Sequence, residues 1–163
     1  MAEKFQLWMS HDVAEHIRRH GAETFPHECC GALLGRDSAA AEKVSAQGET
    51  PAELTREVLQ LFPLVNRRDD SPRNRFAITA DDVRDAEKAA RQHGLEVIGW
   101  YHSHPDHPAR PSDFDREHAW PWYSYVIVSV MAGKPADMTS WRLNDDRQNY
   151  SPEDIEIRKG ALA

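Results

Sequence analysis

The sequence has few cysteines and no long apolar run. Its 163 residues include only two cysteines, Cys29 and Cys30, and because they are neighbours they cannot form a disulfide framework. No apolar stretch approaches the roughly 20 residues needed to cross a bilayer. The first residues lack the charged start, apolar stretch and small-residue cleavage site of a signal peptide. We therefore expect a soluble protein of the reducing cytoplasm with no membrane partner.

An excess of positive charge is also missing. Lys and Arg total 20 against 27 Asp and Glu, which gives a formal net charge of -7. An acidic chain is a poor candidate for non-specific binding to nucleic acid. One group of arginines is interrupted by acidic residues and is interpreted as a solvated loop: Arg67, Arg68, Asp69, Asp70, Arg73 and Arg75. We expect no nucleic-acid partner.

The length and the order of local patterns predict one mixed domain over residues 1–163. Apolar and β-branched runs predict strands over 5–9, 29–35, 42–47, 95–101, 123–131, 138–143 and, more weakly, 154–157. Helices are expected over 11–22 after Ser10, between Thr79 and Gly94, and from Ser112 towards Pro121. The stretch 48–75 is ambiguous: Pro51–Leu61 has helical propensity, whereas Val58–Val65 could be a strand. This alternation predicts an α/β or α+β fold around one sheet.

The run His102-Ser103-His104-Pro105 follows the strand expected over 95–101. Side chains two apart in a strand project from the same face, so His102 and His104 can reach one point while Ser103 turns away. Asp115 comes eleven residues after His104, beyond a proline-rich loop that could return it to that point. Two histidines and a carboxylate form the ligand set of a catalytic zinc site, which leaves the fourth position to water.

Ser112 and Asp115 also have a purely structural interpretation. Ser-x-x-Asp opens a helix as a capping box does, with Ser112 at the N-cap and Asp115 reaching back to it. The two interpretations need not exclude each other, since Ser112 can cap while Asp115 turns towards a metal.

A zinc hydrolase also needs a base to take a proton from water. Glu28, just before the Cys-Cys-Gly segment, is the candidate, although a glutamate at a strand edge can equally be a surface residue. The cysteines are interpreted as buried apolar residues on opposite strand faces, with a nucleophilic thiol as the alternative. Spacing gives no support to the remaining acid–base candidates, His27, Asp106, His107, Asp113, Glu117 and His118.

Together these residues resemble the JAMM metalloprotease motif of the MPN domain. That motif is an upstream Glu, then His-x-His, ten residues and Asp, with a Ser three positions before the Asp. Glu28, His102, His104, Ser112 and Asp115 fill every position. Three flanking segments are similar to the small prokaryotic branch of this family: 26–35, 99–101 and 125–129. The resemblance as a whole covers about residues 5–145.

The resemblance implies a zinc-dependent isopeptidase or peptidase acting after the C-terminal tail of a ubiquitin-like or sulfur-carrier protein that ends in Gly-Gly. It implies that His102, His104 and Asp115 hold Zn²⁺, that Glu28 is the general base and that Ser112 stabilises the oxyanion. The implied fold is α/β, cytidine-deaminase-like, with a curved, mostly antiparallel central sheet flanked by helices. An extended tail would fit a narrow groove beside the zinc and could pair with a sheet edge.

Two alternative functions remain open at this point. The chain could be a non-catalytic MPN scaffold, although such domains typically lose ligands and here all are present. It could also be a zinc hydrolase of a small amide or a deaminase-like enzyme, because a metal and a base do not specify the substrate. The sequence leaves open the substrate, the leaving group, the oligomeric state and whether the loop at 106–108 covers the site. Segment 48–75 is the only sizeable candidate for an insertion that would bind a protein substrate.

Overall fold

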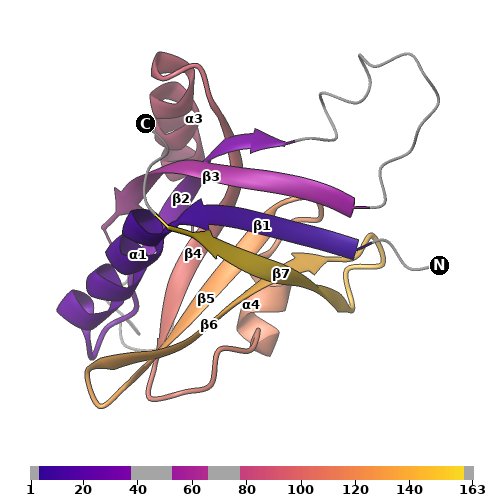
Figure 1. Cartoon of the computed structure of the whole chain (residues 1–163). Coiled ribbons are helices and arrows are strands. Elements are labelled where there is room, and N and C mark those ends of the chain that lie inside the picture. Colours follow the sequence, from indigo (N-terminus) through magenta and orange to yellow (C-terminus); the bar gives the residue numbers. More distant parts are fainter. Residues whose placement is uncertain (1–3, 38–52, 66–77, 160–163) are drawn as a thin grey trace.

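The computed structural model describes residues 4–37, 53–65 and 78–159. Its strands are β1 Lys4–Ser10, β2 Cys30–Asp37, β3 Glu53–Leu64, β4 Glu96–Pro105, β5 Ser124–Met131, β6 Lys134–Leu143 and β7 Tyr150–Arg158 (Figure 1). Its helices are α1 His11–Thr24, α3 Ala80–Gln92 and α4 Asp113–His118. No helix in the described ranges is long and apolar enough to cross a membrane.

Most local predictions are confirmed to within a few residues. Ser10, Thr79 and Ser112 are the N-caps of the three helices, and each side chain accepts a backbone N–H of the first turn. In the ambiguous stretch 48–75, the described part is strand β3, so a helix over Pro51–Leu61 is wrong from Glu53 onwards. The strand expected over 42–47 and the arginine-rich loop lie outside the described residues.

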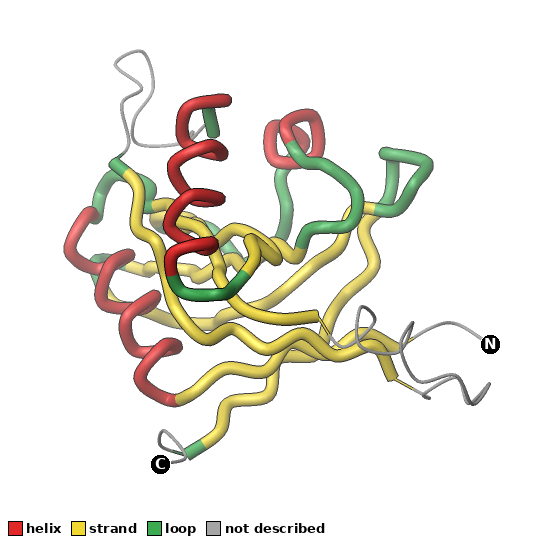
Figure 2. The backbone as a smooth tube through the Cα atoms, turned by 90° about the horizontal axis from the view of Figure 1, so that it is seen from above, coloured by secondary structure: helices red, strands yellow, loops and turns green. Residues whose placement is uncertain are grey.

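The seven strands form a closed barrel in the order β1-β3-β2-β4-β5-β6-β7, and β7 returns to β1. Three pairs are parallel, namely β1 with β3, β1 with β7 and β4 with β5, and the other four are antiparallel. In Figure 2 the strands curve around one region with the helices beside them.

The expected α/β fold with a curved central sheet flanked by helices is therefore wrong, because the described structure is mostly β and its sheet closes into a barrel. The strand expected weakly over 154–157 is in fact the nine-residue strand β7. Strand β7 pairs with one side of β1, whose other side pairs with β3, and this pairing closes the sheet. No strand in the described ranges lies at a sheet edge, which removes the edge on which a tail was expected to pair.

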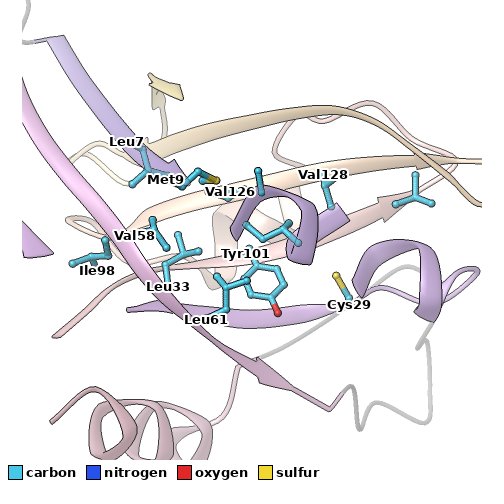
Figure 3. Packing of buried hydrophobic residues seen from close by; sticks show 13 residues of the cluster. Leu7, Met9, Cys29, Leu33, Val58, Leu61, Ile98, Tyr101, Val126 and Val128 are labelled. Carbon is cyan, nitrogen blue, oxygen red and sulfur yellow. The ribbon is translucent and has the colours of Figure 1, made fainter. Parts of the chain in front are cut away.

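The barrel interior holds an apolar cluster to which all seven strands contribute. Leu7, Leu33, Val58 and Val126 are among its buried members (Figure 3). Helix α1 adds Ile17. A second cluster on the opposite strand faces packs α3 against β2, β4 and β5. The strand faces therefore alternate between an inner core and an outer layer, and β4 lies in both.

A buried arginine crosses one end of the barrel and joins four strands. Arg56 of β3 has no exposed surface, and its Nε donates to Asp37 of β2 at 2.8 Å. Its Nη1 donates to the Ile98 carbonyl of β4 at 3.1 Å and to the Ser124 hydroxyl of β5 at 2.9 Å. A charge held this way stabilises closure only while its partners remain, because an unpaired buried charge is strongly unfavourable.

We expect Arg56→Leu to lower the free energy of unfolding by about 3–5 kcal/mol, because it breaks a buried ion pair and the hydrogen bonds that Arg56 donates to β4 and β5. Urea unfolding followed by circular dichroism measures the change. Arg18→Leu is the matched control: it breaks the exposed pair with Glu15, for which a loss of about 0–1 kcal/mol is expected. Equal losses in the two variants would contradict the bridging role of Arg56.

Candidate metal centre

Strand β4 carries both histidines within its regular part. It continues to Pro105, so His102 and His104 both lie on the strand and project from the same face, as expected. Their Nε2 atoms are 3.1 Å apart. Tyr101 and Ser103 on the other face are completely buried. The packing of β4 against the core thus fixes the direction of both imidazoles.

Asp115 reaches the histidines from the first turn of α4, and it forms the capping box at the same time. Its N–H donates to the Ser112 hydroxyl at 3.0 Å, and its Oδ2 accepts the Ser112 N–H at 2.9 Å. The same Oδ2 is 3.0 Å from His104 Nε2, while Oδ1 is 3.3 Å from His102 Nε2. The capping box therefore does not prevent Asp115 from facing both histidines, and its role as a metal ligand stays a prediction.

The geometry of the three side chains fits a tetrahedral zinc ion. Their ligand atoms all lie within 4.8 Å of one another. Ligand atoms at zinc–ligand distances of about 2.0–2.1 Å in a tetrahedron are about 3.3 Å apart, close to the separations seen here. His102, His104 and Asp115 also supply the nitrogen and oxygen donors that zinc prefers.

The loop after β4 fixes the tautomer of His104. His104 Nδ1 is 2.9 Å from the carbonyl oxygen of Pro108. Since a carbonyl only accepts, Nδ1 carries the proton and Nε2 keeps its lone pair for a metal. The Ser129 and Thr139 hydroxyls donate to the carbonyls of His107 and Ala109, both at 2.6 Å. These two anchors on β5 and β6 were missed by sequence reasoning, because no local pattern links them to the loop.

Glu28 is brought to the ligands from the start of β2. It is 4% exposed and lines a pocket of about 310 Å³ together with His104 and Ser112. Burial raises the pKa of Glu28 to about 7, opposed by His102 and assisted by Asp115. A carboxylate with a near-neutral pKa beside a ligand set is suited to accepting and releasing a proton.

The charges of the ligands are strongly coupled. Burial would lower the pKa of His102, but the Asp115 carboxylate, and then Glu28, raise it above its usual value. Burial would raise the pKa of Asp115, but His102 and His104 outweigh this and hold the pKa of that carboxyl well below its usual range. The Asp115 carboxylate therefore favours the protonated form of His102.

The other acid–base candidates have different positions. His107 lines the pocket from the exposed loop, whereas His118 stacks on Phe114 at 4.0 Å between ring centroids. Asp106 accepts the N–H of Ala132, Asp113 pairs with Arg116, and His27 and Glu117 are exposed.

Cys29, just before β2, belongs to the inner cluster, whereas Cys30, the first residue of β2, faces the opposite side beside Trp100; both are buried. Burial raises the pKa of the Cys29 thiol to about 12 and that of Cys30 well above its usual value. A reactive thiol has a lowered pKa, so these shifts oppose the nucleophilic alternative.

Comparison with known proteins finds a family and several relatives. The model of the family described as prokaryotic homologs of the JAB domain matches residues 10–144. The protein called Desampylase from Haloferax volcanii is 30% identical over 118 residues, which cover 72% of this chain and 73% of that protein.

Two solution structures resemble the whole domain. Protein DSY2949 from Desulfitobacterium hafniense has a TM-score of 0.75 and 27% identity, covering 95% of this chain and 94% of that one. A protein from Salinibacter ruber has a TM-score of 0.64 and 44% identity, covering 92% of this chain and 90% of that one.

We expect zinc binding to release a proton near about pH 6, because the raised pKa of His102 means that its proton must leave before Nε2 can bind. Calorimetric titration with Zn²⁺ in two buffers of different ionisation enthalpy measures this release. His104→Ala should weaken binding by about 100-fold or more, while Glu117→Gln on the exposed face of α4 should not change it. A binding enthalpy independent of the buffer would contradict the proton release.

We also expect Glu28→Gln to stabilise the metal-free protein above about pH 7. The pKa of Glu28 is about 7 in the folded protein against an ordinary value of 4.5 in the unfolded chain, so the group favours folding below pH 4.5 and this contribution is lost as the pH rises through 7. Glutamine does not titrate, so the stability gain over wild type should grow between these two values and then level off. Thermal unfolding across this pH range measures it. A gain that does not depend on pH would contradict the raised pKa.

Proposed function

Because this chain belongs to the family of prokaryotic homologues of the JAB domain, we propose that it is a zinc-dependent isopeptidase or peptidase. Its substrate is a ubiquitin-like or sulfur-carrier protein, cleaved after the C-terminal tail. The observation that carries this proposal is the burial of Glu28 in the same pocket as His104 and Ser112. The similarity to an enzyme called Desampylase supports the substrate class.

His102, His104 and Asp115 would hold the zinc. When bound, zinc would supply Lewis acidity and lower the pKa of a bound water towards about 7. The residues around it divide the remaining tasks. The Pro108 carbonyl keeps His104 in the tautomer that can bind, and the Ser112 N–H orients the Asp115 carboxylate.

Glu28 would act as the general base and then as the general acid. Its ionised form takes a proton from the water that attacks the carbonyl carbon, and the proton is then delivered to the leaving nitrogen as the C–N bond breaks. The products are a free tail carboxylate and an amine. Because the pKa of Glu28 is near neutral, it can perform both transfers in one cycle.

Ser112 would stabilise the negative charge that develops on the carbonyl oxygen. Its Oγ accepts the N–H of Asp115, so capping occupies a lone pair and leaves the hydroxyl proton available for donation. Ser112 lines the same pocket as Glu28. A donor aimed at the developing charge typically contributes about 100- to 1,000-fold to the rate.

The pocket itself suits a narrow, extended tail. Besides the catalytic candidates, Pro105, Pro108 and Arg110 line it, so the anchored loop forms one wall. Since the barrel is closed, we propose that the tail lies between this loop and Glu28 instead of extending a sheet. Glycines at the end of the tail would let its backbone pass close to these side chains.

The same geometry weighs on the alternatives. Burying a carboxylate beside three convergent ligands destabilises the fold. A non-catalytic scaffold would gain nothing from this arrangement, which is typical of a functional site. A zinc hydrolase of small amides would use the same residues, and it is separated from the proposal by the substrate.

The test is the cleavage of a sulfur-carrier protein whose Gly-Gly tail is extended by one amino acid, followed by mass spectrometry. We expect Glu28→Gln and His104→Ala to lose about 1,000-fold or more in kcat/KM, and Ser112→Ala about 100-fold. Glu117→Gln on α4 serves as the control with unchanged activity. Equal turnover by all variants would reject the assigned roles, and cleavage of small amides alone would reject the protein substrate.

A further inference from the structure

Ser103 lies between the two histidines but faces away from them. It has no exposed surface and lies on the interior side of β4. Its hydroxyl oxygen accepts the backbone N–H of Cys29 at 2.8 Å, and its own N–H donates to the Cys29 carbonyl at 3.2 Å. One residue thus binds both backbone polar groups of Cys29.

The Cys29 N–H belongs to the peptide bond that follows Glu28. Strand β2 begins at Cys30, whose ladder partner is His102, so Glu28 lies before the first residue of the strand. The orientation of that peptide plane determines the direction in which the Glu28 side chain leaves the backbone. The Ser103 hydroxyl therefore acts on the peptide next to Glu28, at the point where the ladder has ended.

From these contacts we propose that Ser103 is a positioning residue that sets the distance between Glu28 and the metal ligands. The inference rests on the proposed function, in which Glu28 is the base. His102 and His104 flank Ser103 on β4. Three consecutive residues of this strand therefore carry both proposed ligands and the hydrogen bonds that hold the peptide next to Glu28. A movement of β4 then carries the base and the ligands together.

The competing explanation is that Ser103 only satisfies a buried N–H. Ser103 packs beside Gly21 of α1, where a Cβ, if one were present, would lie 3.3 Å from Ser103 Cβ. A purely structural serine would affect stability and leave turnover by the folded protein unchanged. A positioning serine would lower kcat while KM and zinc binding stay the same.

The experiment compares Ser103→Ala and Ser103→Thr with Ser140→Ala. Ser140 is a matched control, since it is a buried serine on β6 whose hydroxyl donates to Glu153 at 2.7 Å. We expect Ser103→Ala to lower kcat by about 10- to 100-fold, because small misplacements of a catalytic group have effects of this size. KM and zinc stoichiometry should stay within about twofold of wild type. Ser103→Thr keeps the hydroxyl and should recover most of the kcat, while Ser140→Ala should keep the wild-type kcat.

A second measurement does not depend on activity. Hydrogen exchange followed by NMR in the metal-free protein should show faster exchange of the Cys29 amide in Ser103→Ala than in Ser103→Thr. Unchanged exchange, or a wild-type kcat in Ser103→Ala, would overturn the positioning role. Failure of the wild-type protein to cleave any tail substrate would instead reject the proposed function, and the exchange rates would still decide whether Ser103 holds the Cys29 amide.

Discussion

The site depends on the contacts of the Asp115 carboxylate with two histidines and a backbone N–H. Its two oxygens face two imidazole nitrogens, and one of them also accepts the N–H of Ser112. This arrangement joins the start of α4 to the end of β4, two segments that share no regular hydrogen bonding. A capping box alone would fix only the helix. Because the same carboxylate is attracted to His102 and His104, the start of α4 is held close to both imidazoles.

Strand β4 transmits the rigidity of the core to this site. Tyr101 and Ser103 are buried on its inner face, and the two histidines lie on its outer face. Alternation along a strand means that neither face can turn without moving the other. The barrel also closes around this strand, with β2 on one side and β5 on the other. The histidines are therefore oriented by the packing and hydrogen bonding of the inner face of β4.

The two ends of the barrel bury charged groups with different partners. Near the site, burial shifts the pKa of Glu28 towards neutrality. At the other end, Arg56 and Asp37 form a buried pair whose hydrogen bonds extend to β4 and β5. Glu28 lines a pocket beside His104, whereas the Nε and Nη1 of Arg56 donate to groups on three other strands. Burial alone therefore does not indicate function, and the partners of the buried group distinguish the two cases.

Local patterns in the sequence determined most of the elements, the N-caps at Ser10, Thr79 and Ser112, and the shared face of His102 and His104. These follow from contacts within a few residues, which periodicity and capping chemistry report directly. The closed barrel was not predictable in this way, because it depends on the parallel pairing of β1 with β7, strands at opposite ends of the chain. The burial of Glu28 beside the ligands, the loop anchors Ser129 and Thr139, and the hold of Ser103 on Cys29 were likewise decided by tertiary structure. Each of these joins residues more than 20 positions apart, and only the folded chain brings such residues together.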